Sequence, residues 1–203
     1  MAQNNRTIII LLSIIIILLI AALGIVVLKG GIPGGKEDAN TDASQKVEIV
    51  EMLPVTVNVS STLPDSYGFS YTAEKSFDGN EFTWWTPNGD YYGQWIEYHF
   101  GQPQKLRGIK ILNGSHYPNF SNGGYNYGDL YYQNAILKEA VLEFSDGSRR
   151  NITLKIYDGM QAIEFPEVLT STVKLVCRGV VPGRRWQDVC ISEFRGMVAR
   201  PAI

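Results

Sequence analysis

The sequence contains few of the side chains that bind metals, form cross-links or carry out catalysis. Its 203 residues include two cysteines and two histidines, and the cysteines do not form the CxxC pairs of a zinc ribbon. The net charge is −2 with no basic stripe, so nucleic acid is not an expected partner. GxSxG, HExxH and P-loop patterns are missing, which favours a binding protein over an enzyme. Acidic residues are scattered, so their spacing alone leaves a glycosidase pair open.

An uncharged apolar run, TIIILLSIIIILLIAALGIVVL, occupies residues 7–28. A helix of this length spans about 33 Å, against about 30 Å for the hydrocarbon core of a bilayer. We therefore predict a transmembrane anchor helix over 7–28, which makes the membrane a partner. The alternative is a signal peptide cleaved near Ala22-Leu23-Gly24, but residues 25–28 continue the apolar run beyond that site and favour retention of the helix.

Residues 29–50 are rich in Gly, Ala, Asp and Ser and show no apolar period, so we predict a flexible linker followed by a domain over 51–203. As a coil the linker spans only about 25 Å, which keeps the domain close to the membrane. Lys29 and Lys36 outnumber Arg6 across the helix, and this flanking charge mildly favours a cytoplasmic domain.

From residue 51 onwards, short alternating apolar runs are separated by Gly-rich turns, and no stretch predicts a long amphipathic helix. This pattern predicts an all-β, antiparallel β-sandwich or jelly roll. The expected strands are 55–60, 95–100, 107–112, 137–144, 151–157, 161–165, 172–177 and 189–194.

A set of motifs in a fixed order resembles discoidin domains, which are the coagulation-factor-type C or galactose-binding-like domains and include the family 32 carbohydrate-binding modules. The motifs are SFDGNEFTWW (76–85), GQWIEYHFG (93–101), GIKILNG (108–114) and DVCISEF (188–194). The middle of the chain, with a tyrosine-rich loop, YYQNAILKEAVLEFSDG (131–147) and LKIYDGMQAIEF (154–165), resembles the bacterial branch called NADase-type glycan-binding domains.

This resemblance covers roughly residues 55–198. It implies an eight-stranded jelly-roll sandwich with binding loops at one end. It also implies export, so we expect the domain on the extracytoplasmic side of a bacterial cell membrane despite the flanking charges. The NADase part of the family name belongs to enzymes that carry such a module as an appendage, and nothing in this sequence resembles their catalytic part.

The resemblance also implies a structural Ca²⁺. In discoidin-like sugar binders, a loop similar to SFDGNEFT and a glutamate similar to the one in ISEF hold this ion, and calcium prefers six to eight oxygen ligands. The matching side chains are Asp78, Thr83 and Glu193, with a carbonyl from Asn80. On the residues alone, Asp78-Gly79-Asn80 is a tight turn, and Arg195 or loop amides could satisfy Glu193 instead.

A long loop, NGSHYPNFSNGGYNYGDLYYQN (113–134), combines aromatic side chains with amides. Aromatic faces cover the apolar face of a pyranose while amides and carboxylates bond its hydroxyls, so this loop is a candidate sugar site. Its candidate ligand-binding residues are His116, Tyr117, Phe120, Tyr125, Tyr127 and Asp129. The alternative is a satellite core made by the loop's own tyrosines, and Tyr131 and Tyr132 are expected to be structural.

A second candidate segment, VVPGRRWQD (180–188), places Arg184, Arg185 and Trp186 in one turn. A guanidinium fork beside a large apolar face suits a sugar, although a solvated turn with a packed tryptophan would have the same sequence. Trp84 is added as a ligand candidate, because Trp85 matches the packing tryptophan of the family and Trp84 is then the freer of the two.

The two cysteines, Cys177 and Cys190, lie in the last two expected strands. In an oxidising compartment they could form a disulfide, and otherwise they are small buried hydrophobes. For function, the sequence favours binding of a glycan of the cell envelope or a nearby surface. The alternatives are an assembly subunit that docks a protein partner, and a lipid-headgroup binder that uses Phe120 as an apolar spike.

Overall fold

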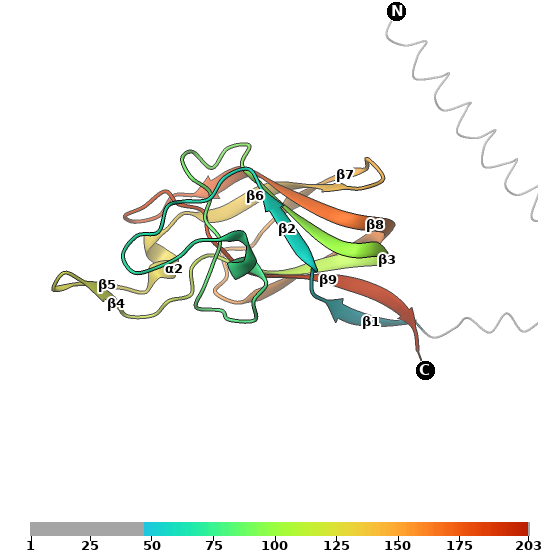
Figure 1. Cartoon of the computed structure of the whole chain (residues 1–203), viewed down its shortest axis with the longest axis horizontal. Coiled ribbons are helices and arrows are strands. Elements are labelled where there is room, and N and C mark those ends of the chain that lie inside the picture. The colour runs from blue at the N-terminus through green and yellow to red at the C-terminus, as the bar shows by residue number, and fades with distance from the viewer. Residues whose placement is uncertain (1–46, 203) are drawn as a thin grey trace, which may run out of the picture. The chain divides into compact units, whose positions relative to one another are not determined.

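Two long, bent strands organise the fold (Figure 1). The computed structural model describes residues 47–202. Strands β3 (Trp95–Asn113) and β8 (Met160–Val181) pair with each other in antiparallel fashion along most of their length. Their register shifts between His99 and Gln104 and again near Gly108, and at these irregularities both strands pass from one layer of the sandwich to the other.

The remaining strands extend each layer outwards from β3 and β8. The first half of β3 pairs with β2 (Thr56–Val59). The second half of β8 pairs with β6 (Ile136–Phe144), and β6 pairs on its other side with β7 (Arg149–Thr153). The second half of β3 pairs with β9 (Ile191–Pro201), and β1 (Val47–Met52) pairs with β9. The order is β1-β9-β3-β8-β6-β7 with β2 beside β3, so hydrogen bonding is continuous through both layers.

The expectation of an all-β antiparallel sandwich is therefore confirmed, but the expected strand list is not. The stretches WIEYHF and RGIKIL are two halves of β3, and QAIEF and TVKLVC are two halves of β8. Gly101, with φ of +77°, and Pro103 mark an irregularity within β3 rather than a turn. Strand β1 and the short β4 (Phe120–Asn122) and β5 (Tyr125–Gly128) were not expected.

The boundary between linker and domain also needs correction. The predicted linker ends at residue 50, whereas β1 begins at Val47, which lies opposite Pro201 of β9. Pairing with β9 recruits these residues into the sheet although their apolar alternation is weak. The predicted transmembrane helix, 7–28, and residues 29–46 lie outside the described residues. Within 47–202, none of the helical segments is long and apolar enough to cross a bilayer.

The core lies between the two layers. Ile96, Tyr98 and Phe100 alternate along β3 and are all buried, as the pattern WIEYHF predicts. The ring of Tyr98 stacks on Phe194 of β9, with 3.8 Å between centroids and 6° between planes. Trp85 is fully buried against this core, and its indole nitrogen donates to the carbonyl of Ser61 at 3.1 Å. Full burial of side chains of this size stabilises the fold by about 1.5–3 kcal/mol each.

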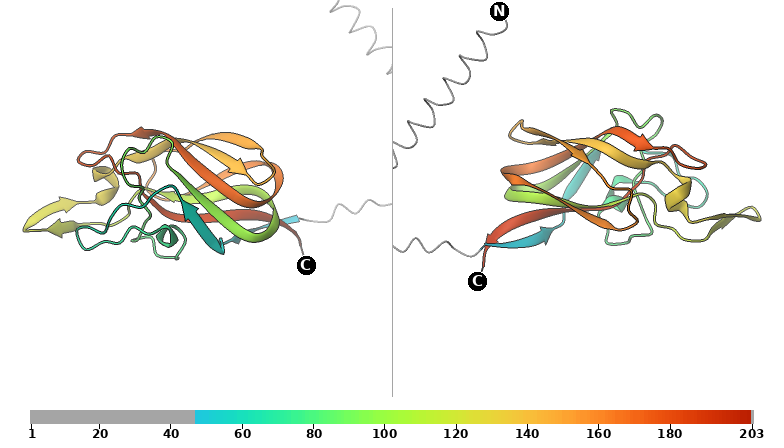
Figure 2. Two further views of the ribbon diagram at one scale, coloured as in Figure 1. Left: turned by 45° about the horizontal axis from the view of Figure 1, so that its top comes forward. Right: turned by 180° about the vertical axis from the view of Figure 1, so that it is seen from behind.

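The loops and short elements gather at one end of the sandwich. Helix α2 (Leu130–Gln133), the β4–β5 hairpin and the turn before β9 lie together there (left in Figure 1), while β1 and the end of β9 lie at the opposite end. The views in Figure 2 show the β4–β5 hairpin projecting from the body at this loop end. The two long candidate segments of the sequence thus meet in space.

Candidate functional site

A cavity of about 280 Å³ opens at the loop end. Three predicted ligand residues line it, although they come from distant parts of the chain. They are Trp84, Phe120 of β4 and Trp186 from the turn before β9. Trp84 is 4% exposed and Phe120 is 6% exposed, so both form the floor of the cavity rather than its rim. This burial corrects one expectation, because Phe120 is not an exposed apolar spike. Trp84 lines the cavity whereas Trp85 is fully buried in the main core, so Trp84 is the freer of the two, as expected.

A third segment of this cavity carries Tyr67, Phe69 and Tyr71, none of which was among the candidates predicted from the sequence. Phe69 is the central ring, with its centroid 4.9 Å from Trp84 and 5.1 Å from Phe120. Tyr67 connects Phe120 to Trp186, at 6.3 and 6.1 Å. The signal for this segment was the alternation in SYGFSY (66–71), where every second residue is aromatic.

A tight turn between Ser66 and Phe69 directs the ring of Phe69 towards the cavity. Ser66 and Phe69 exchange backbone hydrogen bonds of 3.1 and 2.8 Å. Closing so short a loop requires positive φ at its centre, and Tyr67 and Gly68 have φ of 53° and 83°. The hydroxyl groups of Ser66 and Tyr71 lie 3.1 Å apart and connect the two sides of this turn. The aromatic wall is therefore held by its own backbone.

One wall of the cavity is polar. Asn134 donates from its side-chain nitrogen to the carbonyl of Leu130 at 3.1 Å, which leaves its amide oxygen as an acceptor. Thr86 and Cys190 lie 3.4 Å apart, oxygen to sulfur. Asp188 also lines the cavity, and burial raises the pKa of its carboxyl. A cavity with aromatic and acceptor walls can stack on a ring and accept hydrogen bonds from it.

The predicted arginines pack on the outside of this cavity. The guanidinium of Arg185 lies over the rings of Tyr127, Tyr125 and Trp186, at 4.7, 5.2 and 5.5 Å from their centroids. Arg184 lies over Tyr132 at 5.3 Å. The rim residues therefore satisfy one another by cation–π contacts, which are worth about 0.5–1 kcal/mol at exposed sites. The tyrosines of the loop pack on one another and on Phe120, as the satellite-core alternative predicts, and they lie beside the cavity.

The other predicted loop residues do not line the aromatic cavity. The Nδ1 of His116 contacts the carboxylate of Asp158, and its Nε2 lies 3.2 Å from the carbonyl of Asn113. Asp129 caps helix α2 by accepting a hydrogen bond from the amide of Tyr131 at 2.9 Å. Tyr117 is 37% exposed and packs edge-on against Phe69 from outside.

The tyrosines that follow Asp129 differ from each other. Tyr131 is buried, as expected of a structural residue. Tyr132 is half-exposed and carries the guanidinium of Arg184 on its ring. Adjacent residues of a one-turn helix point in different directions, which the sequence alone did not resolve.

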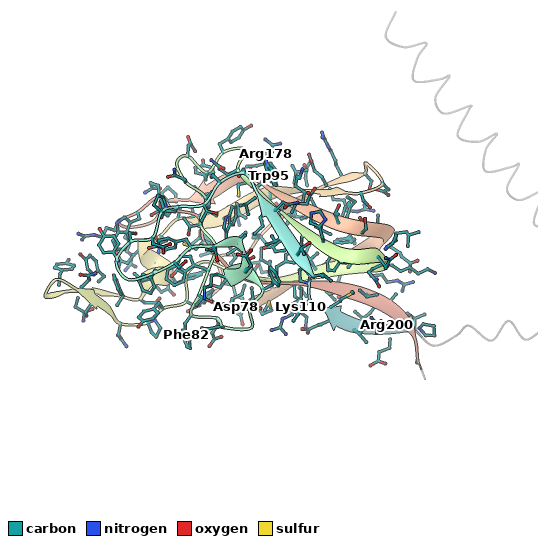
Figure 3. All side chains as sticks on the ribbon, viewed as in Figure 1. Asp78, Phe82, Trp95, Lys110, Arg178 and Arg200 are labelled. Carbon is teal, nitrogen blue, oxygen red and sulfur yellow. The ribbon has the colours of Figure 1, made fainter. Side chains whose placement is uncertain are left out.

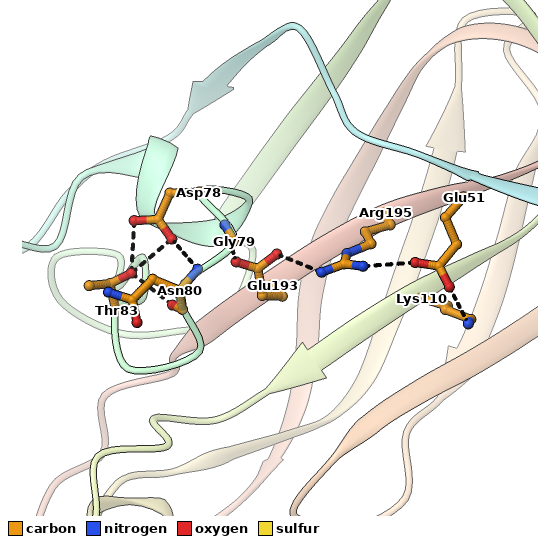
Figure 4. Close-up of polar contacts among 8 residues, drawn as sticks. All are labelled: Glu51, Asp78, Gly79, Asn80, Thr83, Lys110, Glu193 and Arg195. Carbon is orange, nitrogen blue, oxygen red and sulfur yellow. Dashed lines mark hydrogen bonds and ion pairs between the residues drawn. The ribbon is translucent and has the colours of Figure 1, made fainter.

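A second polar site joins the loop after η1 (Ala73–Ser76) to strand β9 (Figure 4). Glu193 is 2% exposed, and its Oε1 accepts a hydrogen bond from the amide of Gly79 at 2.7 Å. Its Oε2 has no hydrogen-bond partner among the described residues, and the nearest cation is Arg195, at 3.8 Å. Burial raises the pKa of the Glu193 carboxyl, opposed by the Gly79 amide and by Arg195.

Arg195 is shared between two carboxylates. It lies 2.9 Å from Glu51 of β1, and Glu51 also pairs with Lys110 of β3. The hydrogen bond from Lys110, followed by the one from Arg195, holds the pKa of the Glu51 carboxyl below its usual value. Because Glu51 engages Arg195 more closely, Glu193 keeps one oxygen without a full partner.

The residues proposed from the family resemblance fit a calcium ion in their donor chemistry. The Asp78 carboxylate accepts from the amide of Asn80 at 2.9 Å and from the hydroxyl of Thr83, which also lies 2.9 Å from the Asn80 carbonyl. Within 47–202 no cluster of three or more His, Cys, Asp or Glu side chains could hold a metal. An ion here would rely on two carboxylates, the unsatisfied Glu193 oxygen and neutral oxygens. Figure 3 shows Asp78 and Phe82 on the same side of the domain.

The possible disulfide between Cys177 and Cys190 is not formed, and both residues are buried free thiols. Strands β8 and β9 are not neighbours in the sheet, because β3 lies between them. Cys177 belongs to the main core and Cys190 to the aromatic cluster at the loop end. Burial raises the pKa of each thiol to about 12.

The antiparallel sandwich with its aromatic cavity among the loops of one end defines a discoidin-like, coagulation-factor-type C domain. More specifically, the chain belongs to the family described as the NAD glycohydrolase translocation F5/8 type C domain, which matches residues 50–195. The resemblance found in the sequence motifs is thereby confirmed. No curated protein is similar enough in sequence to count as a relative.

Solved structures with this fold include family 32 carbohydrate-binding modules. CpGH89CBM32-5 from Clostridium perfringens, in complex with GalNAc-β-1,3-galactose, has a TM-score of 0.51 at 17% identity, over 70% of this chain and 93% of that one. The family 32 module of Clostridium perfringens NanJ, in complex with galactose, has a TM-score of 0.51 at 16% identity, over 73% and 99%. The module of AlyQ, in complex with 4,5-unsaturated mannuronic acid, has a TM-score of 0.50 at 15% identity, over 72% and 97%.

Proposed function

We propose that this chain is a non-catalytic glycan-binding module, tethered to a bacterial cell membrane by the helix predicted over 7–28 and displayed on the extracytoplasmic side. The observation that carries the proposal is the cavity at the loop end, where Phe69, Trp84 and Trp186 face the acceptors Asn134 and Asp188. The similar modules named above are complexed with sugars, which supports a sugar as the class of ligand.

The cavity suits one sugar ring better than a long chain. Its volume of about 280 Å³ lies just below the range for small-molecule sites, which is about 300–1,000 Å³. One ring stacked on an aromatic face with a few hydroxyl bonds gives a Kd near the millimolar end, or about −4 kcal/mol. Tethering confines many copies to one surface, where multivalency offsets this weakness. The natural ligand is then a glycan of the envelope or of a nearby surface.

Calcium has a structural role in this proposal. The ion would be held by Asp78, Thr83 and Glu193, with the carbonyl of Asn80, and it would supply the positive charge that the second Glu193 oxygen lacks. It would then fix the loop after η1 to β9. Trp84 follows Thr83 directly, so the same loop positions the floor of the cavity.

The binding proposal is tested by a glycan array followed by NMR titration of the purified full chain. Amides of residues 66–71 and 184–188 should shift on addition of a binding oligosaccharide. Replacing Phe69 or Trp186 by alanine should weaken binding about tenfold, because stacked aromatic rings supply most of the contact area. Tyr92→Ala is the matched control, since Tyr92 is 64% exposed and lies outside the cavity.

Two results together would contradict the proposal of glycan binding. If a broad glycan panel produces no shifts, and if one stoichiometric protein is recovered with the chain from its native membrane, the chain is an assembly subunit instead.

A further inference from the structure

The carboxylate of Asp188 has no counter-charge in the aromatic cavity. Among residues 47–202 it makes no salt bridge, and the one hydrogen bond recorded at this residue goes from the thiol of Cys190 to the backbone carbonyl. Burial is the sole cause of its raised pKa. The other titratable residues that line the cavity are Tyr67, Tyr71 and Cys190, and none of them can carry a positive charge.

Aromatic rings line the same cavity as Asp188. Tyr71 contacts Trp84 at 6.0 Å and Phe69 at 6.4 Å between centroids. Such rings present negative faces, which attract an ammonium group within about 6 Å. At the rim the same chemistry is already in use, because Arg185 occupies the outer faces of Tyr127 and Trp186. Among residues 47–202, no guanidinium or ammonium group lies over the rings of Phe69, Tyr71 or Trp84, which line the cavity.

We propose that the cavity selects a sugar that carries a free, protonated amino group, with the ammonium placed between the Asp188 carboxylate and the aromatic faces. This inference rests on the proposed glycan-binding function and names its ligand class, an amino sugar without N-acetylation. A neutral hydroxyl donates one hydrogen bond to Asp188 and leaves the charge uncompensated. An ammonium both donates and neutralises, and charge-assisted bonds are about twice as strong as neutral ones. An acidic sugar is repelled.

The test compares two oligosaccharides of equal length, one of glucosamine and one of N-acetylglucosamine, binding to the purified full chain. Wild type should bind the glucosamine oligomer about tenfold more tightly, the ratio expected for one charge-assisted contact. Asp188→Asn should remove this preference while still binding the N-acetylated oligomer, which also shows that the variant is folded. Glu164→Gln is the matched control for net charge, because Glu164 is exposed and lies outside the cavity.

A second measurement uses wild type alone and does not depend on any variant folding. Lowering the pH protonates Asp188 at a value above the usual one for aspartate, while the sugar amine stays charged, so the preference for glucosamine should shrink towards low pH. Equal affinity for the two oligomers, or a preference that persists in Asp188→Asn, overturns this inference and leaves glycan binding standing. Failure of every sugar in the glycan panel removes the proposed function and this inference with it.

Discussion

Gly183 allows the turn before β9 to lie against helix α2. A Cβ atom at this position would lie 2.2 Å from the carbonyl oxygen of Trp186, 2.4 Å from the carbonyl carbon of Asn134 and 2.5 Å from the carbonyl oxygen of Gln133. All three atoms belong to the backbone, so no side-chain rotation can relieve the contact. Gly183→Ala must therefore lift the turn away from α2.

The cost follows from what the turn would lose. Its amides donate to α2 in three hydrogen bonds, from Arg184 to Tyr132 at 3.1 Å and from Arg185 and Trp186 to Gln133 at 3.0 and 2.9 Å. Overpacking destabilises a fold by about 1–3 kcal/mol, and each lost hydrogen bond destabilises it by about 1 kcal/mol. Moving the turn away from α2 relieves the overpacking but breaks these hydrogen bonds. We expect Gly183→Ala to lower the free energy of unfolding by about 2–4 kcal/mol, which is roughly 5–15 °C in Tm.

Thermal and urea unfolding of the full chain measure this cost, and sugar titration measures its effect on the cavity. Because Trp186 lines the cavity, Gly183→Ala should also weaken glycan binding. Gly179→Ala is the control, since its Cβ would meet only the flexible side chain of Glu139, at 3.1–3.4 Å. If Gly183→Ala is as stable as this control and binds sugar normally, the close approach of the turn to α2 does not exist in solution.

Three further predictions concern other parts of the domain. The raised pKa of Glu193 means that the folded state holds its proton to higher pH than the unfolded state, so without calcium stability should fall as pH rises from the usual glutamate value through the raised one. Glu193→Gln should remove that dependence, and chelator should lower Tm in wild type but not in the variant; a wild type indifferent to chelator speaks against calcium. Deleting residues 47–52 should lower Tm, because β1 covers one side of β9; an unchanged Tm would place the start of the domain after residue 52. Cys177 and Cys190 should both be alkylated after unfolding without reductant, and a mass two protons lower would contradict the free thiols.

The sequence by itself determined the fold class and the family. Alternation such as WIEYHF places apolar side chains on one face of a strand, and this local rule is independent of the rest of the chain. The resemblance to discoidin domains implied that the loop of Asp78 and Glu193 meet, and the Gly79 amide does donate to Glu193. Trp85 was assigned to the core, where it is fully buried.

Other features depended on tertiary pairing. Whether a Gly or Pro ends a strand or only bends it is decided by the strands on either side, and the sequence analysis divided β3 near Gly101 for that reason. Cys177 lies in β8 and Cys190 directly precedes β9, but β3 lies between these two strands in the sheet. Strand β1 forms because β9 offers it an open edge.

The cavity was the part that only the tertiary structure could decide. Phe69, Trp84 and Trp186 are far apart in the sequence, and no local pattern says that three loops close over one volume. Aromatic residues in loops have the same composition whether they form a floor, a rim or a satellite core. Asp188 likewise became notable only through its surroundings, since a charge without a partner is defined by the side chains that the fold places, or does not place, beside it.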